Sequence, residues 1–274
     1  MKAFKFILVI LSVFLFGYLQ NNAQSVISRQ SKAKTTTTEK KTVSSQKNVS
    51  KKSKKLGSNS QTNKNKSNEQ PITISAPDDY INGHGYVDLG LPSGTKWATC
   101  NIGATLPEDN GNYYAYGDTS IKSIYDVSTC ITNDVGGVQK EDEAITEKIC
   151  NGENLKPSYD AASVNWGASW RMPTSEEITE LCKKSTWTWV TYKGKKGYKG
   201  VGPNGKSIFL PAAGYKFITS LEADNRIGNY RSSTFQGKYD TFKLFFDNWE
   251  PRDIPRDIKW GSRVSGYSVR PVHS

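Results

Sequence analysis

Short runs of alternating apolar and polar side chains fill the second half of the chain, and turn residues separate them. Such runs span 186–192, 197–201, 207–215 and 241–248. In the first run, TWTWVTY, we expect Trp187, Trp189 and Thr191 to share one face, because successive side chains of a strand alternate. This period of two predicts a half-buried strand. The segments GKKG and GPNG between the runs have the composition of tight turns.

A first helix is predicted over 158–167. Ser158 is a residue type that is favoured as an N-cap, and Gly167 is favoured just past a helix end. Together they set the expected bounds of a short helix.

A second helix is predicted to begin at Thr174. The T-x-x-E spacing from Thr174 to Glu177 is that of a capping box. An apolar stripe at i, i+3 and i+4 follows, formed by Ile178, Leu181 and Cys182. Two lysines then fall in the last turn, where positive charge suits the helix dipole. Glu176 and Glu177 are therefore expected to be acids of a helix start, and they need no catalytic explanation.

The first 24 residues have the pattern of a signal peptide. Two lysines precede an apolar run at 6–17, and Ala23 suits cleavage just after it. The run is shorter than the roughly 20 residues that span hydrocarbon, which disfavours the alternative of an uncleaved membrane anchor. No cysteine precedes Cys100, so the lipid anchor of bacterial lipoproteins is excluded. We expect an exported chain, periplasmic, cell-surface or secreted, with no membrane span after cleavage.

Residues 25–76 are predicted to be a disordered basic linker that precedes a domain over 77–274. Between 25 and 75 there are twelve Lys and Arg, two acids and no aromatic residue, a net charge of +10. Such a segment cannot bury enough apolar surface to offset the entropy of ordering it. Its lysines could attach to an anionic envelope, but charge runs are usually solvated, which favours a soluble spacer. After position 75 the chain has 23 basic and 24 acidic residues, so no nucleic-acid partner is expected.

The residue types that carry common catalytic and metal chemistry are sparse. The four cysteines are Cys100, Cys130, Cys150 and Cys182. An even number in an exported chain predicts disulfides with three possible pairings, and buried thiols are the alternative. No C-x-x-C occurs, and the two histidines, His84 and His273, lie near the ends of the domain, so neither a zinc site nor a Ser-His-Asp triad is expected. A P-loop, a dinucleotide fingerprint and an EF-hand are absent, and no acid pair stands out, so we expect no cofactor, no metal and no catalytic residue.

The irregular segment 247–263 is the strongest candidate for ligand binding. It combines aromatic and arginine side chains, which dominate binding hot spots, with two prolines that stiffen it. The candidate ligand-binding residues are Trp249, Arg252, Arg256, Trp260 and Arg263. A tryptophan face can stack on a sugar ring or a cation. The alternative is that both tryptophans pack inward while the arginines and aspartates are solvated.

Five motifs, in order, resemble those of one known family. They are GYVDLGLPSGTKWATCNIGA, GNYYAYGDT, YDAASVNWGASWRMPTSEE, TWTWVTYKGKKGYKGVGPNGKSIFLPAAGY and SGYSVRPV. Over about 80–272 the chain resembles the Fibrobacter succinogenes major paralogous domain, which occurs on exported and surface proteins of Bacteroidetes. The resemblance implies one α+β domain of C-type-lectin-like fold, with short twisted antiparallel strands and two short helices, distantly similar to formylglycine-generating enzymes.

The chain also departs from the related groups. No cysteine follows Cys182, whereas formylglycine-generating enzymes bind copper through a pair of cysteines in that part, so their activity is not expected here. The strings of calcium-dependent lectins, E-P-N or Q-P-D followed by W-N-D, are absent too. What remains is a scaffold. We expect a structural joint made by Trp166, Trp170, Arg171, Pro173, Thr174 and Glu177.

The function predicted from these observations is that of an exported or cell-surface binding module without catalysis. It would recognise an envelope or host protein or glycan through loops of its C-terminal half. Two alternatives stay open: an enzyme that acts on envelope polymers through unidentified carboxylates, and a purely structural envelope protein. The oligomeric state is not predicted.

Overall fold

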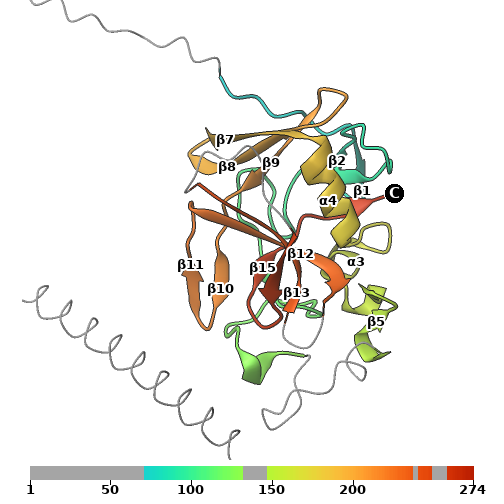
Figure 1. Cartoon of the computed structure of the whole chain (residues 1–274), viewed down its shortest axis with the longest axis vertical. Coiled ribbons are helices and arrows are strands. Elements are labelled where there is room, and N and C mark those ends of the chain that lie inside the picture. Colours follow the sequence, from blue (N-terminus) through green and yellow to red (C-terminus); the bar gives the residue numbers. More distant parts are fainter. Residues whose placement is uncertain (1–70, 132–146, 237–239, 249–257) are drawn as a thin grey trace, which may run out of the picture. The chain divides into compact units, whose positions relative to one another are not determined.

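The largest sheet is built around one long strand, β12, as the computed structural model of the chain shows (Figure 1). The structure describes residues 71–131, 147–236, 240–248 and 258–274, apart from the side chains at 240 and 258–260; all of these belong to one unit, 67–274. The strand order is β14-β13-β12-β15-β4, and β6 pairs with the far end of β12 and with β5. The pair β12–β15 is parallel, and the other pairs are antiparallel. The strands are β4 (Tyr113–Tyr114), β5 (Cys150–Asn151), β6 (Asn154–Leu155), β12 (Ile227–Phe235), β13 (Asp240–Asp247), β14 (Ile258–Ser262) and β15 (Tyr267–Ser268).

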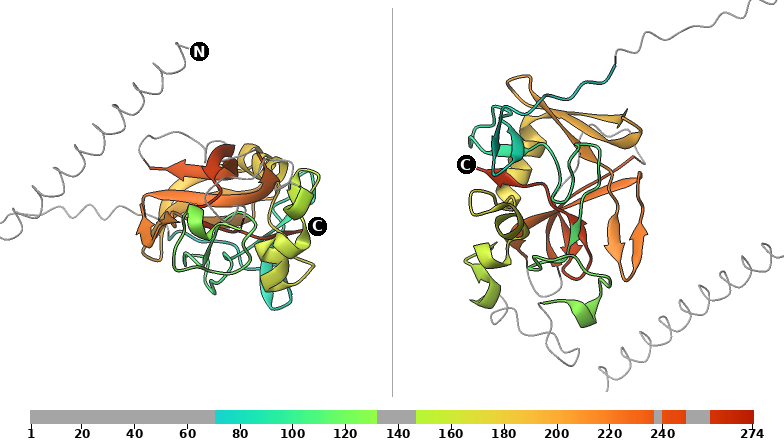
Figure 2. Two further views of the ribbon diagram at one scale, coloured as in Figure 1. Left: turned by 90° about the horizontal axis from the view of Figure 1, so that it is seen from below. Right: turned by 180° about the vertical axis from the view of Figure 1, so that it is seen from behind.

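A small antiparallel sheet joins the beginning and the end of the described domain. Its order is β1-β2-β3-β16, with Val272 of the last strand opposite Trp97 of β3. The strands are β1 (Asp79–Ile81), β2 (His84–Val87), β3 (Lys96–Ala98) and β16 (Val272–His273). Residues that are distant in sequence are thereby placed side by side (Figure 2).

The remaining strands form a three-stranded antiparallel meander and a two-stranded hairpin. The strand predicted at 186–192 is confirmed as β7, in which Trp187 is buried, Trp189 is half-buried and Thr188 is exposed. The run predicted over 207–215 divides into two strands, because the chain turns between them. The elements are β7 (Thr186–Tyr192), β8 (Lys195–Val201) and β9 (Ser207–Pro211) in one sheet, and β10 (Tyr215–Phe217) and β11 (Ser220–Glu222) in the other.

The described part contains the α-helices α3 (Ala161–Trp166) and α4 (Ser175–Lys184) and the 3₁₀ turns η1 (Val127–Thr129) and η2 (Pro157–Tyr159), and residues 147–149 are also helical. The capping box predicted for the second helix is confirmed at α4. The predicted start of the first helix was wrong, since Asp160 rather than Ser158 is its N-cap. The Asp160 carboxylate accepts hydrogen bonds from Ala162 N and Ser163 N, whereas Ser158 lies within η2.

The core consists mainly of two apolar clusters. One lies where α4 packs against the sheets, and Ile178, Leu181, Trp187 and Phe246 belong to it. The other surrounds Trp170 beneath α3. The described part is therefore mostly β with a curled sheet and few helices. Within it, no helix has both the length and the apolar character needed to cross a membrane.

Candidate functional site

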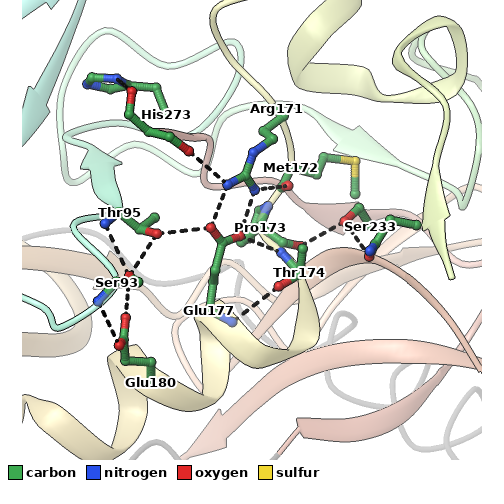
Figure 3. Close-up of polar contacts among 12 residues, drawn as sticks. Ser93, Thr95, Arg171, Met172, Pro173, Thr174, Glu177, Glu180, Ser233 and His273 are labelled. Carbon is green, nitrogen blue, oxygen red and sulfur yellow. Dashed lines mark hydrogen bonds and ion pairs between the residues drawn. The ribbon is translucent and has the colours of Figure 1, made fainter. Parts of the chain in front are cut away.

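The predicted structural joint centres on an ion pair between Arg171 and Glu177 (Figure 3). Arg171 Nη1 donates to Glu177 Oε2 at 2.6 Å, and Nη2 donates to Oε1 at 2.5 Å. Glu177 also accepts from Thr174 N at 2.9 Å and from Thr95 Oγ1 at 2.9 Å. Burial alone would raise the pKa of Glu177, but these hydrogen bonds and the Arg171 charge outweigh it and lower that pKa. The carboxylate is therefore ionised and fully engaged in structural contacts.

The same face of α4 is tied to the loop before β3. Ser93 Oγ donates to Glu180 Oε2 at 2.5 Å, and Ser93 N donates to Glu180 Oε1 at 3.0 Å. Ser93 Oγ also lies 2.9 Å from Thr95 Oγ1 (Figure 3). Two carboxylates one turn apart thus hold one loop against the helix, a role that requires no ligand.

The two tryptophans of the joint are buried beside both histidines of the chain. His84 stacks on Trp166 with ring centroids 3.7 Å apart, and Trp170 lies edge-on to Trp166 and to His273. The Trp170 indole Nε1 donates to Ile81 O at 3.1 Å. Burial lowers the pKa of both imidazoles, so each favours its neutral form. His84 and His273 lie near opposite ends of the domain in the sequence, and no local pattern indicated that both contact the same pair of tryptophans.

Asp160 also belongs to the joint, although the sequence did not predict this role for it. Its carboxylate is buried and also accepts from Met172 N at 2.8 Å, so that it links the start of α3 to the segment before α4. Burial raises the pKa of Asp160, while three backbone N–H groups favour the charged form. Through these contacts Asp160 connects the N-terminus of α3 to the segment that precedes α4.

An open groove runs along the other side of α4, and we name it the α4 groove. It consists of two adjoining cavities of about 480 and 460 Å³ that share Ser175, Glu176 and Phe242. The first cavity extends to Glu153 and Phe235, and the second follows α4 toward its C-terminal lysines. Cavities of several hundred Å³ are of the size that takes a ligand segment.

A bulge in β12 shapes the floor of this groove. The β12–β13 register shifts between Arg231 and Phe235, and the residues between them are buried. Within the bulge, Thr234 Oγ1 accepts from Ser175 N at 2.9 Å and donates to Asn154 Oδ1 at 2.7 Å. A bulge re-aims side chains and is common beside binding sites. Here it links three elements rigidly under the cavity.

One end of the groove is lined by acids, and the other end carries two lysines together with Glu180, which is bound to Ser93. Glu153 and Glu176 are exposed at the end near the start of α4, and Lys183 and Lys184 are exposed at the other end. Burial opposes ionisation of Glu176, but hydrogen bonds from Ser175, from its own backbone and from Thr174 lower its pKa. Glu176 is therefore negatively charged near neutral pH.

The predicted ligand-binding residues do not all reach this groove. Trp249, Arg252 and Arg256 lie outside the described residues. The backbone of Trp260 lies in β14 directly opposite Phe242, a residue of the groove. Arg263, the remaining candidate, is only 2 % exposed, and its guanidinium lies 5.9 Å from the ring centroid of Phe235.

Sequence reasoning missed the residues that line the groove. Phe242 falls within a predicted strand, and its partial exposure depends on the bulge opposite it. Phe235 and Glu153 come together because Phe235 N donates to Glu153 O at 2.7 Å, a contact between residues far apart in the chain. No sequence period indicates such a contact.

The cysteines and metal ligands add no second site. The four cysteines all lie within the described ranges, and no disulfide joins any two of them in the structure. Disulfide pairing of these cysteines stays a prediction. Within those ranges, the structure brings together no group of three or more His, Cys, Asp or Glu side chains suited to a metal ion.

Three comparisons with known proteins returned no match: protein-family models, curated proteins and solved structures. The geometry of the α4 groove is thus the main basis for a functional conclusion.

Proposed function

We propose that this chain is an exported, non-catalytic binding module of the Fibrobacter succinogenes major paralogous domain class, with a C-type-lectin-like fold. The proposal draws on the five sequence motifs and on the mostly β domain with two short helices. Its ligand would lie in the α4 groove. The observation that carries this proposal is the pair of open, adjoining cavities along α4, which together form an elongated site.

The groove has the features of a binding surface. Phe235 and Phe242 offer apolar contact area, and Gln236 and the exposed acids offer polar contacts at their rim. The bulge network around Thr234 holds the floor in place before a ligand arrives, which reduces the entropy lost on binding. Trp260, a ligand-binding candidate predicted from the sequence, pairs with Phe242 across β14 and β13, so its backbone lies beside the groove.

Catalysis is the second candidate, because Glu153 and Glu176 line one cavity. A hydrolase of polymers needs a carboxylic acid whose pKa is raised so that it can donate a proton. Glu176 has a lowered pKa instead, and its carboxylate accepts from Ser175 Oγ at 2.8 Å. It is therefore suited to fixed negative charge rather than to proton donation, and binding is the favoured function.

The test is binding by groove variants of the full chain. Phe242→Ala and Gln236→Ala should each weaken binding to whatever ligand is found in a screen of glycan and envelope-protein arrays. Phe217→Ala, at an exposed phenylalanine on β10, is the matched control and should bind normally. Circular dichroism would verify the fold of each variant. Unchanged binding by both folded groove variants would contradict the proposed site, and turnover of labelled polysaccharide that Glu153→Gln abolishes would establish the enzyme instead.

A further inference from the structure

We propose that the α4 groove binds an extended polypeptide segment that places a lysine or arginine side chain at the Glu153–Glu176 end. This inference rests on the proposed function and specifies its ligand. It follows from the combination of side chains in the first cavity, from their charge and from the length of α4.

The first cavity matches an amphipathic cation. Lys and Arg carry an apolar stem below a charged head, so they need apolar walls and an acidic rim. Phe235 and Phe242 provide apolar walls, and the face of Phe242 can also attract a cation, whereas Phe235 already has the Arg263 guanidinium near its ring. Glu153 and Glu176 provide the carboxylates that would accept charge-assisted hydrogen bonds from the head group.

The charge of the same cavity disfavours anionic ligands. The two charged side chains that line it, Glu153 and Glu176, are both acidic. Glu176 also remains ionised because its pKa is lowered. An acidic polysaccharide would therefore bring like charges together at this end, whereas a basic side chain is attracted.

The aromatic residues favour a peptide over a neutral glycan. Sugar rings commonly stack on tryptophan or tyrosine faces that also offer a polar atom. Among the side chains that the structure describes, the aromatic residues lining the groove are phenylalanines. Among tryptophans whose side chains are described, Trp97, Trp166, Trp170 and Trp187 are buried, and Trp189 packs against the core.

The far end of the groove sets the direction of the ligand. Lys183 and Lys184 line the second cavity, one helix length from Glu176. A helix of 10 residues is about 15 Å long. An extended peptide covers that length with about four or five residues. The segment therefore carries its basic residue at the start of α4, while the mixed charge of Glu180, Lys183 and Lys184 sets no charge for its other end.

A positional-scanning library of short synthetic peptides tests this inference on the full chain. Each position carries Lys, Arg, Gln or Glu in turn. Peptides with one Lys or Arg should bind better than their Gln counterparts by about tenfold. Glu153→Gln combined with Glu176→Gln should remove that preference. Glu222→Gln, at an exposed acid on β11, is the matched control and should keep it.

The outcomes separate this inference from the proposed function. If Phe242→Ala removes binding but the Glu→Gln pair leaves the preference for basic peptides intact, the groove is correct and the assigned contact is wrong. Binding of neutral oligosaccharides, with no peptide bound, would overturn the polypeptide ligand and keep the groove. Peptide binding that survives both Phe242→Ala and Gln236→Ala would overturn the groove and with it the proposed function.

Discussion

Arg171 and Glu177 form a two-pronged ion pair across the start of α4, with both N–H···O distances between 2.5 and 2.6 Å. The same Glu177 carboxylate closes the capping box with Thr174 and binds Thr95. One side chain therefore joins the helix, the segment before it and the loop before β3. This arrangement gives Arg171, Thr174 and Glu177 a structural explanation within the stretch 165–184.

Replacing Glu177 by Gln should destabilise the fold. The variant keeps the shape of the side chain but loses its charge, so that Arg171 is left without its ionic partner. Because Arg171 is partly exposed, with 37 % of its side-chain area accessible, solvent screens the pair. We expect a loss of about 1–2 kcal/mol in the free energy of unfolding, measured by urea denaturation. The exposed Glu222→Gln is the control, and a loss equal to that of the control would contradict a structural role for the pair.

Thr174→Ala should cost about 1 kcal/mol of stability, since it removes the side chain that accepts from Glu177 N at 3.3 Å. Ligand binding should be intact, because Thr174 belongs to the joint and is not among the residues that line the α4 groove. Thermal unfolding and a binding assay on the same sample check both statements. Lost binding in a variant that remains folded would show that the joint itself forms part of the site.

Thr234→Val should destabilise the fold and alter the groove. Valine has nearly the shape of threonine but cannot accept from Ser175 N or donate to Asn154 Oδ1. A buried N–H left without its acceptor costs about 1–3 kcal/mol. Urea denaturation measures the loss, and ligand affinity should fall together with it. A variant as stable as the native chain would mean that the bulge does not depend on this hydroxyl.

Stability should decrease as the pH falls below about 6.5, the ordinary pKa of histidine. His84 and His273 both have lowered pKa values in the folded protein, because burial disfavours their charged forms, and Lys96 adds to the effect on His273. The unfolded chain therefore binds more protons over this range, and protonation favours unfolding. The stabilisation is present above the unfolded pKa and is lost as the pH falls toward the folded pKa values.

Denaturation midpoints at pH 7.5 and 5.5 measure this dependence. His84→Phe keeps an aromatic ring beside Trp166 and cannot be protonated, so it should flatten the slope. An unchanged slope in both His84→Phe and His273→Phe would assign the pH dependence to other groups.

Several local features were predictable because they depend on residues close together in the chain. The capping box of Thr174 and Glu177 spans three residues, and the alternation in β7 needs only the sequence of that strand. Short-range hydrogen bonds and strand periodicity follow directly from residue types.

By itself, the sequence determined where several strands run and where α4 starts. The tertiary structure decided that Asp160 rather than Ser158 caps α3, that Arg263 is buried, and that both histidines meet the same tryptophan pair. The tertiary structure also forms the groove, because Ser175 and Thr234, which bond beneath it, are 59 residues apart in the sequence. Such contacts depend on how whole elements pack, and the register shift in β12 opposite Phe242 has no signature in a local pattern of residues.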